Sequence, residues 1–304
     1  MILLIGAGGY LGCILANAFT SNGEKVITVS TSFQWKTITN EIRYKCSAGA
    51  FDLYSDEIGD VTSIIYMAGS TDLLKAELNP ANDLITHISQ LHTFLQSLSS
   101  AKTKSLERIF FFSSAGAIYG ESSFSSTPKQ EDSILAPISI YGKRNMLLED
   151  IFFNYGKTLN CLYSSVRISN PFGINQNNFR RKGLIHVLLS SAKDQFNVNL
   201  RGNGLQKRDY LFSEDFCRII TGLTKLEVLP RQLNVCSGSS LSAIDIVSMM
   251  NHLNIYPKIT ILPDQPSYEI IESNLSNQLM LNLLGGKVAP LTPMQNALQI
   301  LFNS

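Results

Sequence analysis

Charged side chains are scarce in this 304-residue chain: Asp, Glu, Lys and Arg make up 16% of it, against about 25% in an average globular domain. Because 25 basic residues nearly balance 24 acidic ones, the formal net charge is +1. Such a balance gives no bulk attraction to nucleic acid or to an anionic membrane, so any anion site must be local. Hydrophobic residues make up 44%, which excludes a disordered chain and supplies a sizeable core.

The sequence also lacks the patterns of a disulfide framework, of a zinc site and of a membrane span. Its cysteines lie far apart, with no CxxC and no Cys/His cluster: Cys13, Cys46, Cys161, Cys217 and Cys236. Residues 1–23 carry no charged side chain, but four glycines interrupt them and they have no basic segment, which disfavours a signal peptide or an anchor. We therefore expect a soluble cytoplasmic protein with reduced thiols, no metal site and no membrane partner.

Short β-rich runs alternate with longer helical patterns in the N-terminal half. The pattern predicts strands over 1–6, 25–30, 63–69, 108–114 and 162–169, and helices over 10–21, 83–101 and 141–155. Apolar strands of this kind are typical of a parallel sheet covered by helices on both faces. The C-terminal third is less regular, with helices expected over 183–192 and 292–302 and a strand with a loop over 256–266. The predicted fold class is thus α/β, a doubly wound parallel sheet.

A glycine-rich turn follows the first strand and opens the first helix, with the sequence Gly6-Ala7-Gly8-Gly9-Tyr10-Leu11-Gly12. In this context the first glycine permits a tight turn, the second lets backbone N–H groups approach a pyrophosphate, and the third lets helix and strand pack closely. The pyrophosphate is then expected at the positive end of the helix. The motif predicts a Rossmann-type dinucleotide site formed by Gly6, Gly9, Tyr10, Leu11 and Gly12.

The end of the second strand normally separates NAD-binding from NADP-binding proteins, because an acidic residue there binds the ribose 2′-hydroxyl. Here the strand ends in Val29-Ser30-Thr31-Ser32, with neither an acid nor an arginine. Ser30 is the expected contact, and small hydroxyls with Lys36 nearby suit a 2′-phosphate. The same residues also suit an ordinary surface turn, so the choice between NAD and NADP stays open, with a slight preference for tolerance of NADP.

Beyond the glycine turn, six segments occur in an order that resembles a known family. The first three are Met67-Ala68-Gly69-Ser70, the run 113–120 (SSAGAIYG) and the run 141–145 (YGKRN). The others are 166–173 (VRISNPFG), 202–210 (GNGLQKRDY) and 233–238 (LNVCSG). These segments are similar to those of the extended short-chain dehydrogenase/reductases, and among them to nucleotide-sugar epimerases and dehydratases such as UDP-glucose 4-epimerase.

The resemblance implies two domains. A Rossmann domain that binds NAD or NADP is expected over residues 1–172, with returns near 208–222 and 233–238. A smaller α+β domain for the nucleotide sugar is expected over most of 173–304. The resemblance also implies that Ala68, Gly69 and Ser113 lie against the cofactor.

The implied chemistry is hydride transfer at a sugar carbon. In this family a tyrosine exchanges a proton with a sugar hydroxyl while the nicotinamide exchanges hydride with the same carbon, and a serine or threonine hydroxyl binds that oxygen. By this resemblance Tyr141 is the acid/base. Ser114 is the better candidate for the hydroxyl, because Ala115 stands where the closest epimerases carry their serine.

The family's lysine, four residues after the tyrosine, is Asn145 here. In the family that lysine binds the nicotinamide ribose and favours the phenolate. An ordinary tyrosine has a pKa of about 10, so only about one molecule in a thousand is ionised at pH 7. Asn145 can hydrogen-bond a ribose but supplies no charge, and we expect Lys143 and Arg144 to point elsewhere on the helix. A second departure is His87, where the family often has a structural asparagine; a structural role is expected for it.

The resemblance implies a substrate site that contains Asn170 and Arg208. Further candidates to line it are Ser70, Tyr119 and Arg181. Arg208 corresponds to a family arginine that grips the diphosphate, and Arg181 lies in the cationic run 180–182; guanidinium groups suit phosphates well. The same run is also compatible with a solvated surface, and Asn170 with a turn before Pro171.

The leading functional hypothesis is an NAD(P)-dependent nucleotide-sugar epimerase that acts at C4 of a UDP-hexose through a transient 4-ketose. An NADPH-dependent 4-keto nucleotide-sugar reductase is the alternative, because Asn145 impairs a base more than an acid. A dinucleotide-binding homologue or sensor with impaired catalysis is a third. The resemblance further implies a homodimer through helices 83–101 and 141–155, and a setting such as polysaccharide biosynthesis.

Overall fold

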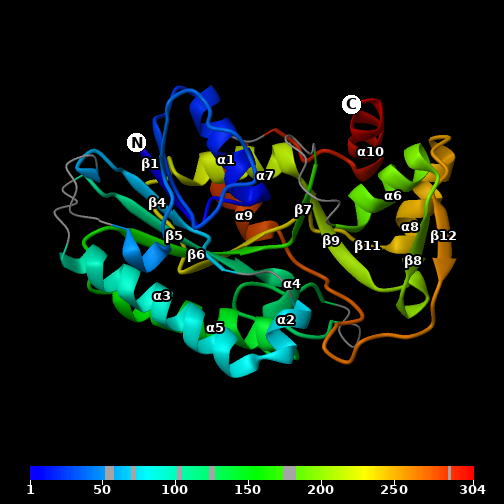
Figure 1. The fold of residues 1–304 in the computed structure, drawn as a ribbon, viewed down its shortest axis with the longest axis horizontal. Helices are drawn as coiled ribbons and strands as arrows, with labels where there is room; N and C mark the ends of the chain where they lie inside the picture. The colour runs from blue at the N-terminus through cyan, green and yellow to red at the C-terminus, as the bar shows by residue number, and fades with distance from the viewer. Residues whose placement is uncertain (52–57, 70–72, 101–104, 123–126, 174–182, 287–288) are drawn as a thin grey trace. The chain divides into compact units, whose positions relative to one another are not determined.

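The computed structural model describes residues 1–51, 58–69, 73–100, 105–122, 127–173, 183–286 and 289–304. Strands and helices alternate along its first half (Figure 1). The central sheet consists of β1 (Ile2–Ile5), β2 (Val26–Val29), β3 (Glu41–Tyr44), β4 (Ser63–Tyr66), β5 (Arg108–Ser114), β6 (Leu162–Ile168) and β10 (Gln232–Val235). The helices of this half are α1 (Tyr10–Ser21), α2 (Leu73–Leu78), α3 (Pro80–Ser100), α4 (Ala115–Ile118) and α5 (Ile140–Gly156).

The chain forms two compact units, each made of several stretches. The first contains Met1–Ser114, Ser139–Arg167 and Ile220–Leu233, and the second contains Ala115–Ile138, Ile168–Ile219 and Asn234–Ser304. The expected Rossmann domain over 1–172, with returns near 208–222 and 233–238, stays a prediction. The chain leaves the central sheet after β6, and β7 (Asn170–Phe172) pairs with β9 (Lys207–Phe212).

The sheet of the first unit has the strand order of a Rossmann fold. Its seven strands lie in the order β10-β6-β5-β4-β1-β2-β3, which contains the arrangement 3-2-1-4-5-6 of dinucleotide-binding folds. The pairs β1–β2, β1–β4, β2–β3 and β4–β5 are parallel. Helices α3 and α5 cover one face and α1 the other (Figure 1). The predicted α/β fold class is therefore confirmed.

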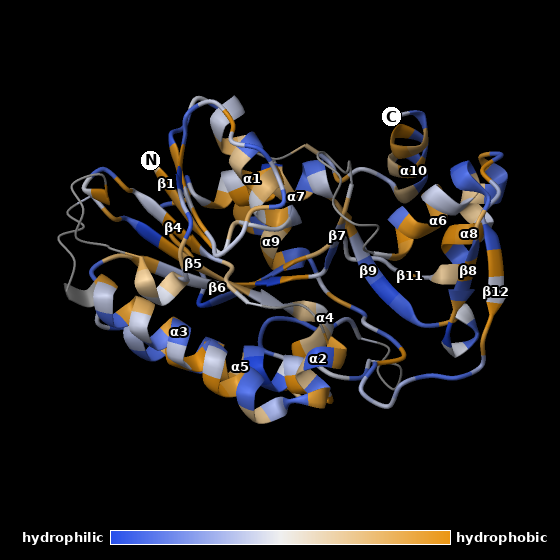
Figure 2. Ribbon diagram, in the orientation of Figure 1, coloured by the Kyte–Doolittle hydropathy of each residue, from blue (hydrophilic) through white to orange (hydrophobic). Residues whose placement is uncertain are grey.

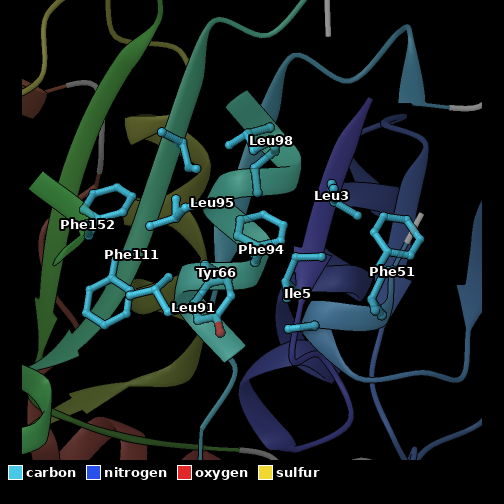
Figure 3. Packing of buried hydrophobic residues seen from close by; sticks show 14 of the residues in the cluster. Leu3, Ile5, Phe51, Tyr66, Leu91, Phe94, Leu95, Leu98, Phe111 and Phe152 are labelled. Atoms are coloured by element: carbon cyan, nitrogen blue, oxygen red, sulfur yellow. The ribbon is translucent and has the colours of Figure 1, made fainter. Parts of the chain in front are cut away.

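The core of the first unit lies between the sheet and the helices α3 and α5. Hydrophobic residues dominate the strands, whereas α3 alternates hydrophobic and hydrophilic residues as an amphipathic helix does (Figure 2). The Tyr66 ring lies 5.1 Å from that of Phe94, and the Phe111 ring lies 5.7 Å from that of Phe152 (Figure 3). Because helices cover the strands β1, β2, β4 and β5, most side chains of these strands are apolar.

The second unit contains smaller sheets. β7, β9 and β11 (Ser240–Ser242) form one, and β8 (Asn197–Leu200) pairs with β12 (Lys258–Ile261) in another. The remaining α-helices within the described residues are α6 (Leu184–Asp194), α7 (Ser213–Leu223), α8 (Ala243–His252), α9 (Gln278–Leu284) and α10 (Met294–Asn303). The core of this unit joins α6, α8 and α10 to the β8–β12 pair through residues such as Leu188, Ile246 and Leu298. None of the helices in the described ranges has the length and hydropathy that a membrane crossing requires.

Candidate functional site

The first and last glycines of the glycine-rich turn are required by the packing of the chain itself. Gly6 has a φ of +85°, and a Cβ added there would overlap the backbone of Ala68 at the end of β4. A Cβ at Gly12 would overlap the backbone of Ala7. The turn after β1 and the close packing of α1 on it therefore depend on these two glycines.

The space beside Gly9 is open. A Cβ added to Gly9 would meet no atom of the described chain within 4 Å, whereas one at Gly8 would overlap the Ser32 carbonyl oxygen. Gly9 is the N-cap of α1, no side chain caps this end, and the first turn holds no acidic residue. The first backbone N–H groups of a helix have no partner within the helix, and its dipole favours an anion there. This helix end is where the sequence predicts the pyrophosphate of a dinucleotide.

Two alanine substitutions separate these roles. Gly12→Ala is expected to lower the free energy of unfolding by about 1–3 kcal/mol, because the added methyl group overpacks the contact between helix and turn. Gly9→Ala is expected to change stability by less than about 1 kcal/mol but to weaken NAD binding about tenfold or more, equivalent to about 1.4 kcal/mol, because its methyl group enters the open space. Urea unfolding and isothermal titration with NAD measure the two effects. Equal NAD affinity in Gly9→Ala and the wild type would contradict the assignment of this space.

The carboxyl ends of three adjacent strands meet beside this turn. Ile5 of β1 is in register with Tyr66 of β4, which is in register with Phe111 of β5. The strands are parallel, so the glycine turn, Ala68 and Ser113 follow at the same edge of the sheet. This edge is where ligands of open α/β sheets bind.

The predicted cofactor contacts along this edge differ in exposure. Ala68 is half-buried and Gly69 is exposed, as the ends of a strand at the sheet edge often are. Ser113 is 5% exposed, and its Oγ has no hydrogen-bond partner among the described residues. Ser114, the last residue of β5, and Tyr10, in the first turn of α1, are half-buried. Their roles toward a cofactor or a substrate stay predictions.

The end of β2 contains an arginine that the sequence analysis missed. The Ser30 N–H donates to the Tyr44 carbonyl oxygen of β3 at 3.1 Å, which brings β3 beside the predicted ribose contact. Arg43 of β3 lies with its Cζ 4.1 Å from the Phe33 ring centroid and 4.3 Å from that of Trp35. Its guanidinium also pairs with Glu41 at 2.9 Å. A carboxylate of the chain itself therefore already pairs with this arginine.

Tyr141 lies in the first turn of α5. Ser139 caps this helix, because its Oγ accepts the Gly142 N–H at 3.0 Å. The Tyr141 side chain is half-buried. Asn145, one turn later, is 5% exposed, and its Nδ2 donates to the Tyr141 carbonyl oxygen at 2.8 Å. One N–H of the Asn145 amide is thus used by a hydrogen bond within the helix.

The expectation that Arg144 points away from Tyr141 is wrong. Its guanidinium Cζ lies 4.8 Å from the centroid of the Tyr141 ring, over the ring face. The physical reason is helical geometry: residues three apart share a face of a helix. Lys143, two residues after the tyrosine, is exposed.

Arg144 is held in place by α3. Its Nη1 donates to both carboxylate oxygens of Asp83, at 2.8 and 2.9 Å. His87 lies one turn after Asp83, with its Nδ1 2.7 Å from the Asp83 carbonyl oxygen and 3.4 Å from Arg144 Nη1. These contacts with Asp83 and Arg144 are consistent with the structural role expected for His87. The i, i+4 spacing of Asp83 and His87 was the signal in the sequence that could have drawn attention to them.

Three predicted substrate contacts lie in the second unit, each with partners inside that unit. Asn170 Nδ2 donates to the Asp209 carbonyl oxygen at 2.8 Å. Arg208 Nη1 donates to the Lys207 carbonyl oxygen at 2.9 Å, and burial lowers its pKa despite nearby acidic groups. Tyr119 is 2% exposed and donates to Asn234 Oδ1 at 2.8 Å. This burial disfavours a sugar contact by Tyr119, although the role stays a prediction.

The other two predicted substrate contacts, Ser70 and Arg181, lie outside the described residues. Leu11, predicted at the cofactor, is half-buried in the first turn of α1. The glycine turn, the strand ends and Tyr141 thus belong to one unit, and Asn170, Arg208 and Tyr119 belong to the other.

Comparison with known proteins identifies relatives of the chain. It is 24% identical over 258 residues to a putative UDP-glucose 4-epimerase of Methanocaldococcus jannaschii, covering 83% of this chain and 82% of that one. It is 27% identical over 183 residues to dTDP-4-dehydro-6-deoxyglucose reductase of Escherichia coli, covering 60% of this chain and 56% of that one. The second match thus spans just over half of the reductase.

Solved structures show the same fold. An NAD dependent NDP-hexosamine 5,6-dehydratase involved in tunicamycin biosynthesis superposes with a TM-score of 0.85 at 19% identity, covering 99% of this chain and 96% of that one. At this identity the likeness shows the fold alone. Residues 2–236, more than three quarters of the chain, match the NAD dependent epimerase/dehydratase family. The glycine turn, the Rossmann strand order and this match together show that the chain belongs to the NAD dependent epimerase/dehydratase family.

Proposed function

We propose that the protein is an NAD(P)-dependent nucleotide-sugar epimerase that acts at C4 of a UDP-hexose through a transient 4-ketose. The observation that carries this proposal is the place of Tyr141, in the first turn of α5 within the unit that also holds the glycine turn. A phenol in the dinucleotide-binding unit suits proton exchange coupled to hydride transfer. The relative named as a putative UDP-glucose 4-epimerase, which matches over more than four fifths of both chains, supports the same choice.

In this proposal each group of the chain has a definite task. The N–H groups at Gly9 and in the first turn of α1 bind the pyrophosphate, and Ser30 binds the adenosine ribose. A nicotinamide bound there would supply the hydride acceptor and donor for the sugar carbon. Tyr141 removes the proton from the sugar hydroxyl at that carbon and later gives it back. Ser114 binds the same oxygen.

Arg208 and Asn170 are proposed to bind the nucleotide sugar. Both lie on neighbouring strands of the second unit, since β7 pairs with β9. A guanidinium supplies the local positive charge that a diphosphate requires in a protein of net charge +1. An arginine loses its proton only far above neutral pH. Arg208 therefore carries a positive charge although burial lowers its pKa.

One observation favours a 4-keto nucleotide-sugar reductase as the second candidate. Asn145 carries no charge and uses its amide on the Tyr141 carbonyl oxygen, so the family's lysine has no replacement at this position. A tyrosine that only donates a proton to a ketone needs less help than one that must also act as a base. The partial match to a dTDP-4-dehydro-6-deoxyglucose reductase supports this candidate.

Two measurements on purified protein test the proposal. Mass spectrometry of nucleotides released on denaturation is expected to detect NAD or NADP. The protein is then expected to interconvert UDP-glucose and UDP-galactose, or their N-acetyl counterparts, without added cofactor. Consumption of NADPH with a 4-keto sugar nucleotide, and no interconversion, would favour the reductase. Dinucleotide binding without turnover on either substrate would indicate a catalytically impaired homologue.

A homodimer through α3 and α5 stays a proposal. Large apolar side chains are exposed on these helices and on the adjoining α2: Ile85 is 66%, Leu78 is 77% and Leu147 is 39% exposed. Exposed apolar residues on neighbouring helices suit a helix-to-helix contact between two copies. The molar mass of the protein in solution tests this proposal.

A further inference from the structure

A buried arginine lies over the ring of the tyrosine that the proposed function makes the acid/base. Arg144 is 2% exposed, with its Cζ 4.8 Å from the Tyr141 ring centroid. Asp83 binds its Nη1 with both carboxylate oxygens, and His87 adjoins the same nitrogen at 3.4 Å. We call these four side chains the arginine cluster. Its members come from α5 and α3, which pack against each other in the first unit (Figure 1).

The surroundings of the His87 imidazole in the arginine cluster disfavour its protonation. Burial is the largest effect and lowers the pKa of His87, and the positive charge of Arg144 lowers it further. The hydrogen bond to the Asp83 carbonyl and the Asp83 carboxylate oppose this but do not reverse it. A second positive charge on His87, beside the guanidinium that pairs with Asp83, is therefore disfavoured.

Other charged groups on the elements around Tyr141 are engaged elsewhere or exposed. On α2, Glu77 accepts the Ile140 N–H at 2.6 Å, and Lys75 is exposed. On α5, Lys143 is exposed, where solvent and salt screen its charge. A charge within about 4–6 Å in a buried site has a much larger effect on ionisation than an exposed one.

We propose that Arg144 is the cation that favours the Tyr141 phenolate, in place of the family lysine that Asn145 replaces. A phenolate spreads negative charge into its ring, so a cation held over the ring face binds the ionised form more strongly than the neutral phenol. Asp83 keeps the guanidinium in place, although its negative charge offsets part of the effect. Arg144 acts through Tyr141 and is therefore a positioning residue. The inference rests on the proposed function for its role in turnover, but not for its effect on the phenol.

The effect on the phenol is measurable in the protein without substrate. The chain has 11 tyrosines, so the ultraviolet titration curve of a Tyr141→Phe variant is subtracted from that of its parent to isolate one phenol. Arg144→Gln is expected to move the midpoint of this difference curve up by about one pH unit, a tenfold fall in the phenolate fraction near neutral pH. Arg144→Lys, which keeps the charge, is expected to stay within about half a unit of the wild type.

Lys143→Gln is the matched control, because it removes one positive charge from the residue directly before Arg144 on the same helix. Its midpoint is expected to move by less than about 0.3 unit, since that lysine is exposed and screened. A second variant, Asn145→Lys in the Arg144→Gln background, is expected to bring the midpoint back down. The proposal is overturned if the Arg144→Gln and wild-type curves coincide, or if Lys143→Gln moves the curve as far.

Removing Arg144 alone leaves the Asp83 carboxylate unpaired in a largely buried site, and this can unfold the protein. The double variant Asp83→Asn with Arg144→Gln removes both charges and avoids that cost. Its midpoint is expected to rise in the same direction by a smaller amount, and a fall or no change would contradict the proposal.

Turnover distinguishes this inference from the proposed function. If the protein interconverts a UDP-hexose pair, the acidic limb of its pH–rate profile is expected to move up by about one unit in Arg144→Gln. If the protein shows no turnover but the difference curves separate as described, the proposed function fails and the role of Arg144 stands. If turnover is present and the titration curves coincide, the proposed function stands and the role of Arg144 fails.

Discussion

Replacing Tyr141 by phenylalanine is expected to lower turnover on a sugar nucleotide by about 10²–10⁴-fold, the range that general acid–base groups contribute. The variant keeps the ring, so the guanidinium of Arg144 still packs against it. It also keeps the helix cap from Ser139 and the hydrogen bond from Asn145 to the backbone. Stability and NAD affinity are therefore expected to stay close to those of the wild type, and steady-state kinetics with isothermal titration measure both.

A matched control lies at the other end of the same helix. Tyr155 is half-buried, and its hydroxyl lies 2.8 Å from His92 Nδ1, at the exposed surface. Tyr155→Phe removes a phenol oxygen from α5 without touching the first turn, and turnover is expected to fall by less than about twofold. Equal losses in the two variants would mean that hydroxyl groups stabilise the helix and that Tyr141 has no special chemical role.

The elements that the sequence predicted best are those whose pattern is strongest. The helix 10–21 and the strand 108–114 have the predicted bounds, because a glycine turn fixes the start of the first and a run of apolar residues defines the second. The helix predicted over 83–101 begins three residues earlier, at Pro80, a position that suits the first turn of a helix. Such strong local signals fixed the fold class.

Other elements carry no such signal. β3 (Glu41–Tyr44) was not predicted, because it is an edge strand of four residues with half-exposed polar side chains. Its pairing with β2 is a long-range contact that no local pattern indicates. The prediction at the end of β2 was therefore incomplete, since Arg43 reaches that region from β3.

The candidate site was predicted in its parts but not in its contacts. The glycine turn, Tyr141 and the departure at Asn145 follow from motifs with fixed spacing. The contact of Arg144 with Tyr141 was missed, although residues three apart share a helix face, because the family pattern directs attention to the residue four apart. Asp83 comes from a different helix, and only the packing of α3 against α5 brings it to the arginine.

A second large effect is expected where α5 is tied to β6. Glu149 of α5 and Arg167 of β6 form an ion pair whose side chains are each 3% exposed. Arg167 Nε donates to Glu149 Oε1 at 3.0 Å, and Nη2 donates to Oε2 at 2.7 Å. Arg167→Met leaves the carboxylate buried without this partner. The free energy of unfolding, measured with urea, is expected to fall by about 3–5 kcal/mol.

An exposed ion pair provides the comparison. Arg201 and Asp264 are 58% and 61% exposed, and their charged atoms are 3.6 Å apart. Arg201→Met is expected to change stability by less than about 1 kcal/mol, because solvent screens such a pair. A similar loss in both variants would show that the burial of the Glu149–Arg167 pair has no energetic consequence.

Replacing both members of the buried pair separates the cost of an unpaired charge from the worth of the pair. The double variant Glu149→Leu with Arg167→Met removes both charges of this pair, so stability is expected to recover most of what Arg167→Met loses, within about 1 kcal/mol of the wild type. Glu149 lies about two turns after Tyr141 on α5, and the ion pair is one of the contacts that fix this helix on the sheet. If apolar packing fixes α5 equally well, the double variant keeps the turnover of the wild type. Restored stability with lost turnover would instead show that the ion pair sets the position of Tyr141 more finely than packing does.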